Sequence, residues 1–280
     1  MPSIIIIARA RIYILRNMAE VIDGYNCPHC GAPLKVKQGE LIVICKYCSS
    51  TVGLKANAKY YLAHSIIPAR YDAKAITASI QSWMNGGVYL PDDLASRSKI
   101  VELRCTYLPF FVFDIKATTV FKGYLTRTGG SEKREDTLDK KYPWKVLARR
   151  DSKFPTSEFK IPLSGKVPFN ISEMLPGAEF LNAELDDVEA KELAQSQIET
   201  HQRALLKDIV DEITRDETVV DFRSSEFVHA PVWYAVYEYK GQQHWMYLDA
   251  CSGQVIRAEA PTPDTSIGGV FRGLKHAFTD

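Results

Sequence analysis

Residues 99–127 read KIVELRCTYLPFFVFDIKATTVFKGYLTR. β-Branched and aromatic side chains dominate this stretch, and such residues favour half-buried strands. Pro109 stands in the middle of the stretch, and a proline removes one backbone donor from a sheet ladder. We therefore expect two or three antiparallel strands here, as part of an α+β fold.

A helix is expected just upstream of these strands. Residues 66–84 contain Asp72, whose carboxylate can cap the first turn of a helix. Ile76, Ile80 and Trp83 follow at helical spacing, which predicts one apolar face. The expected order in this part of the chain is helix and then antiparallel meander.

The same order recurs downstream. Residues 186–217 begin with two aspartates and predict a long amphipathic helix with one apolar face, formed by Ala190, Ala194, Ile198, Leu205, Ile209 and Ile213. In the aromatic stretch 228–259, Lys240-Gly241 and Ser252-Gly253 mark the two turns of a three-stranded meander. The chain is therefore either a duplicated helix-plus-meander unit or two unrelated halves.

Six segments describe the expected organisation: an N-terminal arm at 1–24, a ribbon at 25–56, a first helix-plus-meander unit at 57–128, a charged loop and proline-rich connector at 129–181, a second unit at 182–262 and an amphipathic tail at 263–280. The loop is expected because residues 127–141 are charged, rich in turn formers and aperiodic.

Both ends of the sequence leave alternatives open. The arm is either a start-site artefact, because Met18 offers a second start, or a genuine strand-like or membrane-touching segment. The tail either docks on the sheet of this chain or folds on a partner or a membrane surface.

Two Cys-x-x-Cys pairs flank fourteen residues in CPHCGAPLKVKQGELIVICKYC, residues 27–48. Two such turns at the tips of neighbouring hairpins supply the four thiolates of a tetrahedral zinc site. A redox motif would need a βαβ setting, and disulfides would need an oxidising compartment. We therefore expect one structural Zn²⁺ bound in a zinc ribbon by Cys27, Cys30, Cys45 and Cys48.

A closed set of four cysteines has no open coordination position for a substrate, so this zinc is expected to stabilise the fold. The sequence contains no phosphate-binding loop, dinucleotide fingerprint, zinc-protease motif or esterase motif. Cys105 and Cys251 are expected to be small apolar residues in strand-like stretches. His201, His229 and His244 are expected to be packed or surface residues, so we predict no enzyme activity.

The composition limits the partners. Lys and Arg total 35 against 34 Asp and Glu, so the net charge of +1 supplies no global attraction for nucleic acid or anionic lipid. Any nucleic-acid contact must come from a local patch, for which Lys35, Lys37, Lys46 and Lys55 are the candidates. The sequence has no apolar run long enough to span a bilayer and no secretory signal pattern, so a cytoplasmic location is expected.

Three motifs together carry a family resemblance: the cysteine-rich stretch, YLPFFVFDI at 107–115 and APVWYAVYEYKGQQHWMYLDACSGQVIRAEAPT at 230–262. With them the chain resembles a group of prokaryotic zinc-ribbon proteins, often labelled transcription-factor-B-type zinc fingers or primosomal-helicase-like. The ATPase motifs of a helicase are missing here. Many members of that group continue into membrane-spanning segments and have no assigned activity, whereas this sequence ends at Asp280 after a short amphipathic tail.

The function expected from the sequence is that of a non-enzymatic zinc-binding adaptor or scaffold with a protein partner. The alternative is a nucleic-acid-associated factor whose ribbon contacts RNA or DNA. Peripheral membrane contact through the tail is a further expectation.

Overall fold

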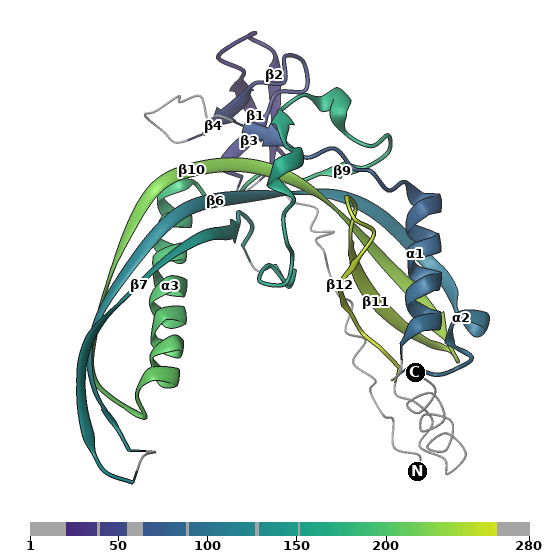
Figure 1. Cartoon of the computed structure of the whole chain (residues 1–280). Helices are drawn as coiled ribbons and strands as arrows, with labels where there is room; N and C mark the ends of the chain where they lie inside the picture. The colour runs from purple at the N-terminus through teal and green to yellow at the C-terminus, as the bar shows by residue number, and fades with distance from the viewer. Residues whose placement is uncertain are drawn as a thin grey trace, which may run out of the picture.

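The computed structural model describes residues 21–37, 40–54, 64–87, 90–126, 129–150 and 152–261, and of Val21–Gly24 it describes the backbone only. In this part the chain forms an arch made mostly of antiparallel strands with three α-helices, which confirms the α+β class (Figure 1). Two strands of 27 and 28 residues, β6 (Lys99–Leu125) and β10 (Glu212–Tyr239), run antiparallel along the whole arch.

The two legs of the arch use the same kinds of element. In one leg β7 (Glu132–Leu147) pairs with β6, and α3 (Asp187–Ile209) packs on the sheet. In the other leg the sheet contains β11 (Gln242–Asp249) and β12 (Val255–Ala258), with α1 (Ala73–Gly86) and α2 (Leu94–Arg97) beside it (Figure 1).

Short elements complete the span between the legs. On either side of the central strands lie β5 (His64–Ile66), β8 (Val167–Pro168) and β9 (Glu179–Phe180). Two 3₁₀ turns, Leu163–Gly165 and Ile171–Glu173, occur in the segment that links β7 to α3. A pair of small two-stranded sheets sits on top of the span (Figure 1), formed by β1 (Val21–Asn26), β2 (Pro33–Lys37), β3 (Ile42–Ile44) and β4 (Thr51–Gly53).

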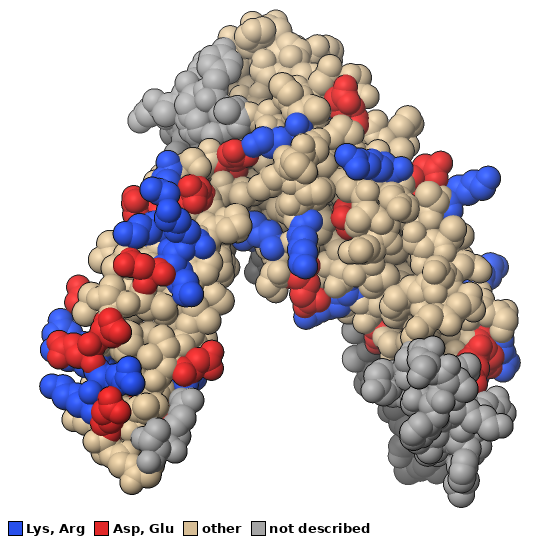
Figure 2. Space-filling model, in the orientation of Figure 1, with Lys and Arg blue, Asp and Glu red and all other residues tan. Residues whose placement is uncertain are grey.

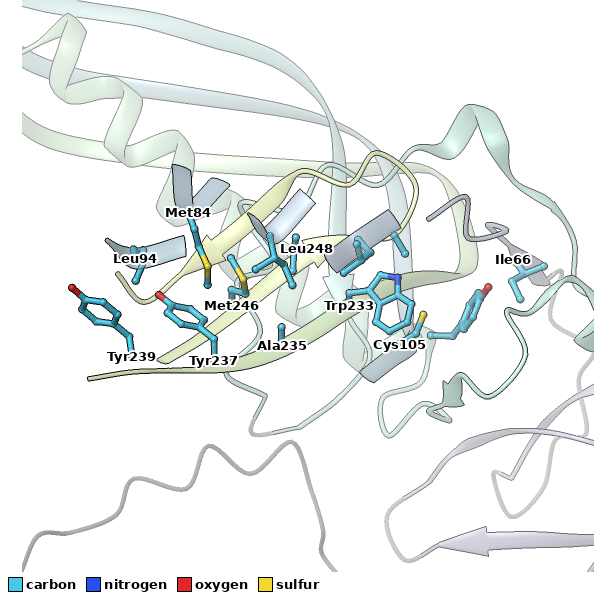
Figure 3. Packing of buried hydrophobic residues seen from close by; sticks show 14 residues of the cluster. Ile66, Met84, Leu94, Cys105, Trp233, Ala235, Tyr237, Tyr239, Met246 and Leu248 are labelled. Atoms are coloured by element: carbon cyan, nitrogen blue, oxygen red, sulfur yellow. The ribbon is translucent and has the colours of Figure 1, made fainter. Parts of the chain in front are cut away.

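Each main helix packs on the hairpin of the other half of the chain. Ile76, Ile80 and Met84 of α1 are buried against side chains of β10 and β11 that include Tyr237 and Met246 (Figure 3). In the other leg, the α3 stripe packs on β6 residues from Phe111 to Ala117 and on Val146 of β7. Because α1 precedes β6 and α3 precedes β10, the halves interlock and form one continuous sheet.

The prediction of two or three strands over 99–127 is wrong, because Lys99–Leu125 form one strand. Pro109 lies in its middle without breaking it. The Pro109 carbonyl accepts a hydrogen bond from Ala148 N at 2.9 Å. Pro109 has no N–H to donate to the Ala148 carbonyl in return, and that carbonyl accepts a hydrogen bond from Glu184 N at 2.8 Å instead. The missing donor therefore leaves no unpaired carbonyl at this point.

The prediction of a solvated loop over residues 127–141 is also wrong for most of that range, because Glu132–Leu147 form strand β7. Its charged side chains lie on a sheet edge exposed to solvent, and some pair across to β6: Lys122 contacts Glu135 at 2.5 Å and Lys116 contacts Asp139 at 3.6 Å. Charge on both faces is compatible with an edge strand, where it also discourages association with other chains.

Several local predictions are confirmed. The Asp72 carboxylate accepts from Ala75 N at 2.8 Å as the N-cap of α1, and Asp186 forms a capping box with Glu189 at the start of α3. Lys240 and Gly241 both have positive φ, as a two-residue hairpin turn requires. In α3, however, Gln202 and Leu206 are buried in place of Leu205.

Other predictions fall beyond the described residues. The amphipathic tail and the first twenty residues of the arm lie outside them, as does Lys55. In the described segments, no helix combines the length and the apolar character needed to cross a bilayer.

Candidate metal centre

The two Cys-x-x-Cys turns have matching backbone geometry. Cys27 N donates to Ala32 O at 2.8 Å and Gly31 N donates to Cys27 O at 2.8 Å. The second turn repeats both bonds at 2.9 Å, between Cys45 and Ser50 and between Ser49 and Cys45. Gly31 and Ser49 occupy equivalent positions with φ of 75° and 59°, so Ser49 adopts the left-handed conformation that a glycine enters more easily.

These turns bring the four predicted ligands together. The Sγ atoms of Cys27, Cys30, Cys45 and Cys48 all lie within 4.8 Å of one another, and such a cluster could hold a metal ion. Sγ of Cys27 lies 3.6 Å from that of Cys48, and Sγ of Cys30 lies 3.7 Å from that of Cys45. The four cysteines carry no disulfide. Cys27 and Cys45 are buried, whereas Cys30 is exposed.

Proton affinity within the cluster is uneven. Hydrogen bonding to the Ser50 hydroxyl and backbone lowers the pKa of the Cys48 thiol to about 5. The Ala32 backbone amide acts to lower the pKa of the Cys30 thiol, but desolvation and the neighbouring sulfurs raise it to about 12. Four sulfurs this close cannot all be thiolates without a cation between them, so metal binding at this cluster releases protons.

The cluster closes a very small core, which consists of six buried residues: Cys27, Leu34, Val36, Val43, Cys45 and Val52. Two of the six are the buried cysteines themselves. A core of this size gives little hydrophobic stabilisation by itself, and a metal ion bound by the four cysteines would add a cross-link between the two hairpins.

The hairpins are fastened to the arch by strand β3. Ile42 is 1% exposed and packs into the α3 cluster of the arch instead of the small core. Its backbone forms an isolated bridge with Ala183, in which Ile42 N donates to Ala183 O and Ala183 N donates to Ile42 O, both at 3.2 Å.

A polar network reinforces this junction. Asn182 Nδ2 donates to Glu40 Oε2 at 3.0 Å, and the same carboxylate oxygen accepts from Lys37 N at 2.9 Å. Arg149 donates to the Asn182 carbonyl at 2.9 Å and forms an ion pair of 2.7 Å with Glu184, in which both side chains are largely buried. The cysteine cluster is therefore fastened to the arch through this polar network.

Two histidines form a chain of hydrogen bonds that links strand β4 of the cysteine hairpins to the sheet of the arch. His64 Nε2 and His229 Nδ1 are 2.6 Å apart, His229 Nε2 lies 2.8 Å from Leu181 O, and His64 Nδ1 lies 2.9 Å from Thr51 Oγ1. Because a carbonyl can only accept, His229 donates to Leu181 and accepts from His64, which in turn accepts from Thr51. Both rings are neutral in this chain of hydrogen bonds.

Burial enforces the neutral state of this pair. Desolvation, with a smaller contribution from His229, lowers the pKa of His64 to about 2, and desolvation lowers the pKa of His229 to about 3. Phe169 stacks on His64 at 4.1 Å and Phe180 stacks on His229 at 4.0 Å between ring centroids. Sequence reasoning noted His229 as a packed residue but missed its partner His64, because no spacing rule links positions 165 residues apart.

The other candidate residues do not gather into a site. Cys105 is buried in β6, and desolvation raises the pKa of its thiol to about 12. Cys251 lies in the turn after β11 and not in a strand, and desolvation, followed by the effect of Asp249, raises its thiol pKa to about 12. His244 stacks on Tyr237, and His201 contacts Tyr142 and Trp144 on α3 and β7.

The outer surface of the cysteine hairpins is basic and aromatic. Lys35 and Lys37 lie on the exposed face of β2, and Lys46 and Tyr47 lie between the two cysteines of the second turn. Tyr47 is 72% exposed, the largest value among the exposed large hydrophobic residues of the described segments.

Comparison with protein-family models, with curated proteins and with solved structures finds no match.

Proposed function

We propose that this protein is a non-enzymatic zinc-binding scaffold in which residues 25–56 form a zinc ribbon on the span of the arch. The observation that carries the proposal is a closed set of four cysteine sulfurs in hairpins that are hydrogen-bonded to the arch. A catalytic zinc keeps a coordination position open for water or substrate, and four protein thiolates fill every position of a tetrahedral shell. The metal then stabilises a surface and performs no chemistry.

Zinc is supported by the spacing of the sulfurs. With Zn–S bonds of about 2.3 Å, the edge of a regular tetrahedron of sulfurs is about 3.8 Å. Two of the sulfur–sulfur distances are 3.6 and 3.7 Å, close to that edge. An all-sulfur tetrahedral set suits zinc or an iron–sulfur centre and is poorly suited to Mg²⁺ or Ca²⁺.

Two finer features belong to the same proposal. The order helix, long strand and hairpin strand occurs in α1–β6–β7 and again in α3–β10–β11, which supports a duplicated unit. The matching backbone geometry of the two Cys-x-x-Cys turns supports the resemblance to zinc-ribbon proteins.

Metal analysis tests the centre itself. The purified chain should carry one zinc per molecule by inductively coupled plasma mass spectrometry, with no iron. Cys27→Ser combined with Cys45→Ser should abolish the zinc, whereas Cys251→Ser, outside the cluster, should leave it at one. Full zinc in the double variant would disprove the ligand assignment.

Affinity capture tests the scaffold function. The tagged chain is captured from its own cells with and without nuclease. A defined protein that is retained at constant stoichiometry after nuclease treatment supports a scaffold. A chain that retains no stoichiometric protein under any condition argues against it.

A nucleic-acid-associated factor is the second candidate, and exposed Tyr47 beside Lys46 favours it. An exposed aromatic ring can stack on an unpaired base, and neighbouring lysines can contact phosphates. The test is binding of fluorescently labelled single-stranded RNA and DNA at low and high salt. A salt-dependent affinity that falls about tenfold with Tyr47→Ala, and also with Lys46→Gln, would support this candidate. Absence of binding at low salt would exclude it.

A further inference from the structure

A groove follows the free edge of β7. It is a cavity of about 770 Å³ whose floor is residues 142–147 of that strand. One part of its lining is the stripe Leu193, Gln197 and His201 of α3, and another is formed by residues 152 and 154–158 of the segment after β7. The strand ends under the span of the arch (Figure 1), and Figure 2 shows basic side chains along this underside.

The floor of the groove presents an unpaired strand edge. Among the described strands β7 pairs only with β6. Ala148 N donates to Pro109 O across this pair, and the register is continuous along β7, so the even-numbered residues direct their backbone groups toward β6. The odd-numbered residues Pro143, Lys145 and Leu147 therefore direct theirs into the groove.

These outward groups can accept a new strand over a short length only. The backbone N–H groups of Lys145 and Leu147 have no hydrogen-bond partner in the described parts of the chain. Pro143 contributes a carbonyl but no N–H, so a pairing strand cannot bond continuously past it. The edge offers two donors and three carbonyls between positions 143 and 147, enough for a segment of about four to six residues.

The charge in the groove is positive and incompletely compensated. Arg149 is paired with Glu184 and Arg257 with Glu158, but Lys145 has no carboxylate partner in the described residues. Its Nζ donates only to the Ser157 carbonyl, at 3.4 Å. Burial, together with nearby Lys160, lowers the pKa of Lys145, so a carboxylate in the groove would relieve an existing repulsion.

The walls add apolar contact area. Leu193 is 41% exposed on α3, and beside it Trp144 donates to Gln197 Oε1 at 2.9 Å, which holds the indole against the helix. The rings of Tyr142, Trp144 and His201 lie 5.3 to 6.0 Å apart between centroids. At that spacing the rings contact one another, so they form an apolar wall and leave no room for a cation among them.

We propose that this groove binds an extended peptide segment of a partner protein, with acidic and apolar residues in alternation, as a short strand added to the free edge of β7. Backbone hydrogen bonds to Lys145 and Leu147 supply the pairing, carboxylates face Lys145 and Lys160, and apolar side chains face the α3 wall. The inference rests on the proposed scaffold function and names where and how a partner binds.

A displayed library of random nine-residue peptides, selected on the zinc-loaded full chain, tests the proposal. Enriched peptides should alternate acidic and apolar residues. Lys145→Gln removes the charge and keeps the N–H, and should weaken binding about fivefold; Lys145→Pro removes both and should weaken it at least about twentyfold. Lys133→Pro is the matched control, because it changes the same edge of β7 outside the groove and should leave affinity within about twofold.

A second measurement separates strand addition from simple charge attraction. N-methylation of the peptide amides that face β7 should abolish binding while leaving the peptide charges unchanged. Equal binding by the methylated peptide, equal binding to the Lys145→Pro and Lys133→Pro variants, or enrichment of no acidic peptide would overturn the proposal.

Two further outcomes would also count against it. A concentration-dependent dimer of the chain that Lys145→Pro abolishes would assign the edge to a second copy instead of a partner peptide. A chain that holds one zinc but binds no peptide refutes the groove and leaves the scaffold function standing.

Discussion

The cysteine hairpins, proposed above as a zinc ribbon, and the arch differ most in what stabilises them. The small core under the cysteine cluster has six buried residues, two of them cysteines, whereas the α1 leg of the arch alone buries a cluster of fourteen. Hydrophobic burial stabilises a fold in proportion to the apolar area removed from water. The arch can therefore form from apolar contacts, whereas we expect the cysteine hairpins to need a bound metal and the arch beneath them.

Removing the cysteine ligands should have the largest effect on the difference in stability between the two regions. In the Cys27→Ser and Cys45→Ser double variant we expect residues 27–54 to lose all amide protection in hydrogen exchange, because structural zinc contributes about 10–16 kcal/mol to such small domains. The sheet between β6 and β10 should keep its protection. The Cys251→Ser variant serves as the control, and loss of protection in both regions would show that the arch also depends on the metal.

Ile42→Ala should have the next largest effect, because it removes the side chain that joins the two regions. Ile42 is 1% exposed and packs on the arch, so we expect a loss of about 2–5 kcal/mol in unfolding free energy. The matched control is Val43→Ala, which is buried in the small core on the other side of the same strand. Only Ile42→Ala should make the ribbon exchange independently of the arch; equal exchange behaviour of the two variants would refute the junction.

The cysteine cluster could be predicted from the sequence, because two Cys-x-x-Cys turns within a short stretch of chain are the spacing of a four-thiol metal site. The starts of the two main helices could also be predicted from the sequence, because Asp72 and Asp186 are local capping signals. Such features depend on neighbouring residues, and no knowledge of the fold is needed to interpret them.

The misread elements depend on contacts far away in the chain. β7 carries charge on both faces and becomes a strand because β6 offers an edge for its whole length. Gln202 is buried in an otherwise apolar stripe because Ala117 O and the Tyr142 hydroxyl satisfy its amide. Pro109 is tolerated because Glu184 replaces its missing donor. Sequence patterns alone do not contain these tertiary partners.

The third largest effect should come from acidification, which should weaken the junction through the neutral pair His64 and His229. Their pKa values are lowered to about 2 and about 3, below the value of about 6.5 for an unfolded histidine. Stability is therefore complete above about pH 6.5 and falls as the pH decreases, by up to about 1.4 kcal/mol per pH unit for each histidine.

Denaturation at pH 7 and pH 5.5 measures this dependence. Zinc release at low pH adds its own effect, so the informative quantity is the difference between wild type and the His64→Leu, His229→Leu double variant. The double variant should show a smaller loss of stability on acidification, whatever its stability at pH 7. An unchanged slope in the double variant would disprove the role of the pair.

The charge pairs of β7 should contribute least, and measuring them shows whether the arch needs charge at all. Lys122 and Glu135 are 39% and 50% exposed, so solvent screens their attraction and the pair is worth about 0.2–1 kcal/mol. A double-mutant cycle with Lys122→Gln and Glu135→Gln should give a coupling free energy in that range at low salt and close to zero in 1 M NaCl. A coupling above about 2 kcal/mol that persists in high salt would mean that charge holds this leg together. A small coupling leaves the backbone ladder to β6 and the packing of α3 as the forces that turn a charged sequence into a strand.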